Sequence, residues 1–110
     1  MENKWKIYAD AISHYGIDNQ KNMLVEECGE LLNAMAKHKR DRATTRDVIT
    51  ELADVSIMVE QMALFFGREQ FDVEKERKIE RLKYRLLDKE KKPLGYDENE
   101  MYDGTYKFNK

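Results

Sequence analysis

The sequence of 110 residues contains one cysteine, one proline and five glycines, and each scarcity excludes a class of structure. A single cysteine, Cys28, cannot form an intrachain disulfide or a multi-cysteine zinc site, so we expect a small buried apolar residue there. The few helix breakers leave long uninterrupted stretches, in which 41% hydrophobic and 38% charged residues favour amphipathic helices. The composition predicts an all-α fold in a single domain.

The sequence also lacks an excess of positive charge and any long apolar run. The formal net charge is −2, and basic residues are interleaved with acidic ones, so we expect no polymeric nucleic acid as a partner. No apolar stretch approaches the roughly 20 residues that span a bilayer, and residues 1–10 contain no secretory core. We therefore expect no membrane partner and a cytoplasmic location.

Apolar periodicity and capping residues predict four helices with short connections. The predicted segments are residues 2–15 up to Gly16, 18–40 capped by Asp18, 44–66 capped by Thr44 and ended by Gly67, and about 72–88 starting at Asp72. Asp47, three residues after Thr44, gives an approximate capping box. We expect residues 1–90 to form the domain and residues 91–110 to form a polar tail.

The second and third predicted helices each gather their apolar residues into one arc when successive residues are placed about 100° apart. The predicted core arcs are Leu24, Cys28, Leu31, Leu32 and Met35 on the second helix, and Val48, Leu52, Val55, Val59, Met62 and Phe66 on the third. These arcs predict the faces on which the two helices are buried.

Each of these two helices carries a pair of carboxylates three residues apart beside its apolar arc. Glu27 and Glu30 lie beside the first arc, and Glu51 and Asp54 lie at similar offsets beside the second, whereas Glu26 points nearly away from the first arc. Because the connection between the helices is short, an antiparallel hairpin can bring the pairs face to face. For either pair alone, a solvated helix face is the competing interpretation.

Four convergent carboxylates repel one another unless their pKa values rise or a divalent cation binds. An all-oxygen set suits Mg²⁺, or Mn²⁺, better than zinc. The two histidines, His14 and His38, stand at neither the spacing of a zinc site nor that of a di-iron site. The residue types therefore favour magnesium as the cofactor.

The strings Glu26-Glu27-Cys28-Gly29-Glu30 and Glu51-Leu52-Ala53-Asp54 resemble the E-E-x-x-E and E-x-x-D motifs of the MazG-like nucleoside triphosphate pyrophosphohydrolases. The resemblance covers about residues 5–85 and implies a four-helix bundle that forms a homodimer or homotetramer. It also implies hydrolysis of a nucleoside triphosphate, with a dNTP favoured, at the α-phosphate to give a monophosphate and pyrophosphate. By the same resemblance, Glu27, Glu30, Glu51 and Asp54 are the metal ligands, and Glu26 and Glu27 are the candidate catalytic residues.

Such a substrate requires groups that bind phosphate and base. Candidates for the phosphates are the cations Lys37, Arg40, Lys78 and Arg81, and candidates for the base are the ring-bearing residues Trp5, Tyr8, His14 and Tyr15. Solvated charges and core packing are the competing interpretations for these residues. The alternative function is a non-catalytic helical interaction module whose acidic face is solvated or binds a partner.

Overall fold

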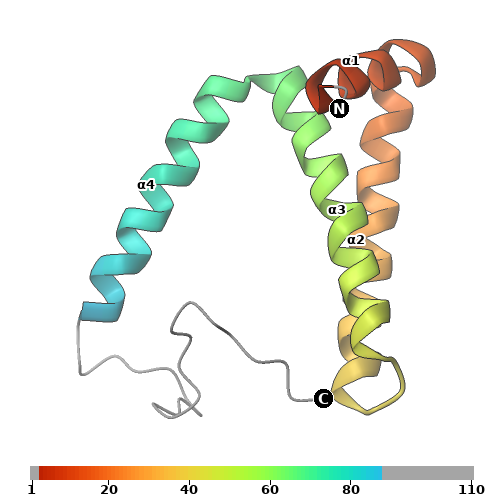
Figure 1. The fold of residues 1–110 in the computed structure, drawn as a ribbon, viewed down its shortest axis with the longest axis vertical. Coiled ribbons are helices and arrows are strands. Elements are labelled where there is room, and N and C mark those ends of the chain that lie inside the picture. The colour runs from red at the N-terminus through yellow and green to blue at the C-terminus, as the bar shows by residue number, and fades with distance from the viewer. Residues whose placement is uncertain (1–2, 88–110) are drawn as a thin grey trace. The chain divides into compact units, whose positions relative to one another are not determined.

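The computed structural model describes residues 3–87, and these fall into two compact units, one up to Arg68 and one from Glu69 onward. All regular structure in the described range is helical, as the sequence predicts. The first unit contains α1 (Lys4–Tyr15), α2 (Ile17–Lys39) and α3 (Thr45–Phe66) (Figure 1). Helix α4 (Arg68–Leu87) begins at the last residue of the first unit, and its remaining residues make up the described part of the second. None of these helices is apolar over a length that would cross a membrane. The predicted tail, residues 91–110, lies outside the described residues.

The ends of the helices are set by local capping groups. The Asn3 side chain accepts a hydrogen bond from the Trp5 amide at the start of α1. Gly16 ends α1 with a positive φ of 89°, a conformation that glycine adopts without steric cost. Thr44 and Asp47 exchange side-chain and backbone hydrogen bonds at the start of α3, which confirms the predicted capping box.

Two predicted helix starts are wrong by a few residues. The second helix begins at Ile17, directly after Gly16, so Asp18 lies in its first turn and does not cap it. The fourth begins at Arg68 instead of Asp72, because Gly67, with φ of 146°, turns the chain at one residue and no linker is needed. In both places a single glycine separates consecutive helices.

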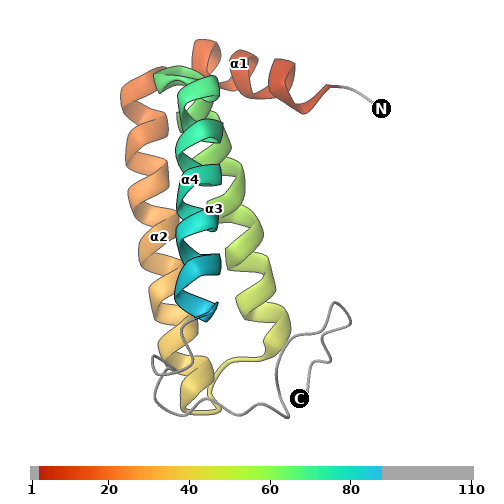
Figure 2. The ribbon, with the colours of Figure 1, turned by 90° about the vertical axis from the view of Figure 1, so that its left-hand side faces the viewer.

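Helices α2 and α3 form an antiparallel hairpin, and α1 crosses the end at which α2 begins and α3 ends (Figures 1 and 2). The stripes along which the two hairpin helices meet have alternating spacings of three and four residues. These seam positions, all buried or half-buried, are Gln20, Leu24, Glu27, Leu31, Ala34 and His38 on α2, and Val48, Glu51, Val55, Met58 and Met62 on α3. Two glutamates thus occupy positions that an ordinary helical hairpin fills with apolar side chains.

Most of the buried residues lie in the middle of the hairpin or toward its α1 end, and Ala34 lies nearer the turn. The buried residues are Tyr8, Ala34, Met58, Met62 and Ala63, together with the polar residues Gln20 and Gln61. Gln20 Nε2 donates a hydrogen bond of 2.8 Å to Gln61 Oε1 across the hairpin, and Gln61 Nε2 in turn contacts the Met58 sulfur at 3.6 Å, so both buried amides have a partner. The Tyr8 hydroxyl donates a 2.5 Å hydrogen bond to Glu60 Oε1, which links α1 to α3.

Part of the predicted core is exposed. Leu32, Met35, Leu52 and Phe66 keep between 50% and 71% of their surface in contact with solvent, and Cys28 is only half-buried. With two further exposed residues these four make up the apolar face of the hairpin: Val25, Leu32, Met35, Ile49, Leu52 and Phe66. Helical spacing places this face on the side of the hairpin opposite Glu30 and Asp54. On each of the two helices, the stripe that faces the other helix is therefore rotated about the helix axis from the predicted apolar arc toward the carboxylates.

Candidate metal centre

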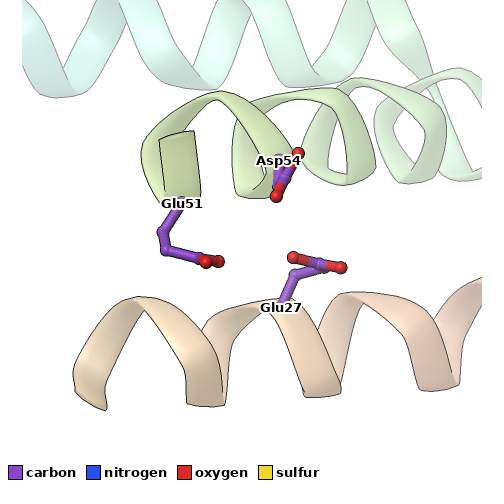
Figure 3. A group of neighbouring side chains, drawn as sticks. All are labelled: Glu27, Glu51 and Asp54. Carbon is purple, nitrogen blue, oxygen red and sulfur yellow. The ribbon is translucent and has the colours of Figure 1, made fainter. Parts of the chain in front are cut away.

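Three carboxylates meet in the middle of the α2–α3 hairpin. Glu27 extends from α2 toward α3, and Glu51 and Asp54 extend from α3 toward α2 (Figure 3). One oxygen of each residue lies within 4.8 Å of the corresponding oxygens of the other two, and all three side chains are half-buried. The spacing of the sequence predicts this convergence, and the hairpin produces it.

Two carboxylate oxygens at this centre have no compensating partner. Within the described part of the chain, Glu27 Oε2 and Glu51 Oε2 are buried and accept no hydrogen bond. Because a buried acceptor without a donor is costly, nearly all such groups in folded proteins are satisfied by protein or water. The seam positions of these glutamates therefore impose a cost that a bound donor or cation would remove.

The electrostatics of the centre agree with its geometry. The pKa of Glu27 is raised from its ordinary value, first by desolvation and then by the negative charges of Glu30, Asp54 and Glu51. The pKa of Glu51 is raised by desolvation, by the charges of Glu30 and Asp54, and by a side-chain hydrogen bond with Glu30. Without a cation, the centre thus favours proton uptake.

A hard divalent cation fits this donor set. The centre supplies only carboxylate oxygens, which suit Mg²⁺ or Mn²⁺, and the described part of the chain adds no histidine or cysteine to the group. Three protein ligands leave further coordination positions for water or phosphate, as is usual for Mg²⁺ in proteins. Both residues that carry an unpartnered oxygen, Glu27 and Glu51, belong to this set, so one ion bound there would lie close to both carboxylates.

The other two predicted acidic residues lie at the edge of the centre. Glu30 is exposed and lies outside the close group of three, but its charge acts on both Glu27 and Glu51. Glu26 is exposed, and of all the charges that raise the pKa of Glu27 its own acts most weakly. The structure therefore brings three of the four predicted ligands together and places the fourth beside them.

The predicted phosphate-binding cations differ in whether they line the pocket beside the centre. Lys37 lines a pocket beside the centre, whereas Arg40 is the exposed C-cap of α2 and is not among the residues that line it. Arg42, in the connection between α2 and α3, does line the pocket and was missed because no periodicity applies within a turn. Lys78 and Arg81 lie on α4, in the second unit, and their role stays a prediction.

The predicted base-binding residues on α1 have neighbours of their own. The guanidinium carbon of Arg68 lies 3.6 Å from the centroid of the Trp5 ring, and Tyr8 meets the same ring edge-on with centroids 5.4 Å apart. His14 is exposed and packs edge-on against Tyr15 at 4.7 Å. The Trp5 ring is therefore already stacked on a cation, and Tyr8 is a core residue bonded to Glu60.

Compared with known proteins, the chain matches no protein family, no curated protein and no solved structure at a significant level.

Proposed function

We propose that the protein is a magnesium-dependent nucleoside triphosphate pyrophosphohydrolase of the MazG-like type. The observation that carries this proposal is the convergence of Glu27, Glu51 and Asp54 from two helices, with two buried oxygens that accept no hydrogen bond from any described residue. A hairpin that served only as a scaffold gains nothing from carboxylates in its seam. A metal-binding hairpin requires them.

The sequence pattern supports the same reaction class. The acidic residues of the centre belong to the E-E-x-x-E and E-x-x-D strings of this chain, the motifs on which the resemblance to that enzyme group rests. In the proposed reaction, water attacks the α-phosphorus of a nucleoside triphosphate and the bond from that phosphorus to the bridging oxygen breaks. The products are a nucleoside monophosphate and pyrophosphate, and we favour a dNTP as substrate.

The chain's own residues have separate tasks in this proposal. Glu27, Glu51 and Asp54 hold the cation, and Glu30 adds the negative charge of a fourth carboxylate beside them. When bound, Mg²⁺ neutralises the triphosphate and lowers the pKa of coordinated water. Glu26, one residue before Glu27 and open to solvent, is the candidate to accept a proton from the attacking water.

The proposal includes a homodimer or homotetramer, in which the helices form a bundle. The apolar face supports it, since Val25, Leu32 and Phe66 each expose 68% to 71% of their surface. Clustered apolar side chains of this size on a small domain are typical of association surfaces. Light scattering coupled to size exclusion should give a mass of two or four chains, and Leu32→Glu should reduce it to one.

Product analysis is the direct test of the reaction. The protein is incubated with a panel of dNTPs and NTPs plus Mg²⁺, and monophosphate, diphosphate, pyrophosphate and orthophosphate are resolved. We expect monophosphate and pyrophosphate in equal amounts, lost on chelation and lost in Asp54→Asn. Diphosphate with orthophosphate would reject attack at the α-phosphate, and full activity of Asp54→Asn would reject the site.

The apolar face also supports a second candidate, a non-catalytic interaction module. In that case the six exposed apolar residues bind a partner and the acidic centre is a solvated face. The module predicts that Mg²⁺ has no greater effect on stability than an equal ionic strength of Na⁺. The enzyme predicts selective stabilisation by the divalent cation.

A further inference from the structure

A pocket of about 320 Å³ lies where the hairpin approaches its turn, directly beside the candidate metal centre. Glu51 belongs to both the centre and the pocket, and Glu30 also lines the pocket. This volume is many times that needed for one water, so the pocket can hold a ligand of several non-hydrogen atoms. A ligand in this pocket would therefore contact the metal centre at one end.

Two cations, Lys37 and Arg42, line the other part of the pocket. Within residues 3–87, neither forms a salt bridge with a carboxylate. The third carboxylate of the pocket, Asp47, accepts a 2.9 Å hydrogen bond from the Thr44 amide, which lowers its pKa, and the charge of Lys37 contributes to that lowering. Among the described residues, neither cation donates a side-chain hydrogen bond to Asp47. Both cations thus keep their hydrogen-bond donors for a ligand.

The position of Arg42 is fixed by the backbone of the turn. Asp41 adopts a left-handed conformation with φ of 58°, and the Arg42 amide donates a 2.7 Å hydrogen bond to the Lys37 carbonyl. The Arg40 amide donates to the same carbonyl over 3.0 Å. The chain therefore wraps around the end of α2 and brings Arg42 beside Lys37, although the two lie five positions apart in sequence.

We propose that this pocket binds the β- and γ-phosphates of the nucleotide, with Lys37 and Arg42 as ligands, so that the phosphate tail points toward the hairpin turn. The inference rests on the proposed function of the neighbouring carboxylates. Three carboxylates and two cations line the pocket, so a free anion is repelled unless a divalent cation neutralises the centre. An arginine placed in this way can donate two parallel hydrogen bonds to phosphate oxygens.

This direction has a consequence for substrate choice. The departing pyrophosphate of a triphosphate lies in the pocket, and the nucleoside extends from the centre toward the α1 end of the hairpin. A nucleoside monophosphate leaves Lys37 and Arg42 without a ligand, and a diphosphate fills the pocket only in part. The pocket therefore selects for triphosphates, whichever base they carry.

Binding of inorganic pyrophosphate, measured by isothermal titration calorimetry in Mg²⁺ and again in EDTA, tests the inference without turnover. We expect binding only with Mg²⁺, and Arg42→Ala should weaken it about tenfold or more, as loss of a charge-assisted contact does. Arg46→Ala is the matched control, because Arg46 is an exposed cation four residues away that does not line the pocket. It should stay within about twofold of the wild type, and Arg42→Lys should recover part of the loss.

Melting temperatures of the variants show whether each one is folded, and the outcomes separate the two proposals. Equal pyrophosphate affinity in Arg42→Ala and Arg46→Ala would overturn the phosphate pocket, even if the enzyme hydrolyses nucleotides. No binding of pyrophosphate to the wild type in Mg²⁺ would overturn it too. Binding that depends on Arg42, in a protein that hydrolyses no nucleotide, would support the pocket and refute the proposed hydrolysis.

Discussion

Replacement of Glu27 by glutamine tests the metal centre most directly. The change keeps the size of the side chain and removes one charge from a group in which three carboxylate oxygens lie within 4.8 Å. A glutamine N–H can also donate to the buried Glu51 Oε2, which has no donor among the described residues. We therefore expect the metal-free variant to melt at a higher temperature than the metal-free wild type.

The metal response should change in the opposite direction. A cation that binds only the folded wild type, at a hundredfold excess over its Kd, stabilises by about 2.7 kcal/mol. For a domain of this size that corresponds to a rise in Tm of about 10–20 °C. If loss of a ligand weakens metal binding about tenfold, the same cation concentration gives only about half of that rise.

Differential scanning fluorimetry with Mg²⁺ or Mn²⁺ titrated against EDTA measures both effects. Asp10→Asn is the control, because it makes the same chemical change at an exposed carboxylate whose partner is Lys6 on the same helix. It should lower Tm slightly, as loss of a surface ion pair does, and leave the full metal response. A Glu27→Gln variant that keeps the wild-type response, or melts lower than the wild type in EDTA, would refute the reasoning.

Three further outcomes follow from the described contacts. In EDTA the wild-type Tm should fall as pH rises above 4.5, the ordinary pKa of these carboxyl groups, because the pKa values of Glu27 and Glu51 are raised in the folded protein. The stability that the two groups give is complete below 4.5 and is lost as each group ionises. Replacement of both by glutamine should flatten the pH profile, and a pH dependence equal to the wild type would contradict the assignment. Thr44→Ala removes the side-chain cap of α3 and should cost about 0.5–2 kcal/mol of unfolding free energy in urea, whereas Thr44→Ser should cost little. Gln61→Leu leaves the Gln20 amide buried without its partner and should cost about 1–3 kcal/mol, and leucine at both positions should recover much of that loss; additive costs in the double variant would argue against the pair.

Local chemistry in the sequence was sufficient to predict the ends of several helices. A cap requires only a few neighbouring residues, so Gly16, Gly67 and the Thr44–Asp47 box were identified without tertiary information and are confirmed. The same applies to the carboxylate pairs, because a separation of three residues places two side chains on one side of any α-helix. The fourth helix begins at Arg68, before the predicted start at Asp72, because it follows directly on the glycine turn at Gly67.

The sequence alone could not decide which stripe of each helix faces the other. On α2, the stripe that includes Leu24 and Leu31 and the stripe of Val25 and Leu32 both repeat at intervals of three and four residues, so periodicity permits either. The hairpin buries the first, with Glu27 in it, and leaves Leu32 71% exposed.

Tertiary packing determines which stripe of each helix faces the other, and with it which carboxylates converge at the candidate metal centre. Only after two helices meet do Glu27 and Glu51 lose solvent and acquire raised pKa values. Only a closed turn brings Arg42 next to Lys37, because its position depends on a hydrogen bond to a carbonyl five residues earlier and not on any repeat. The sequence by itself determined which residues carry the charges, whereas the distances between those charges belong to the folded hairpin.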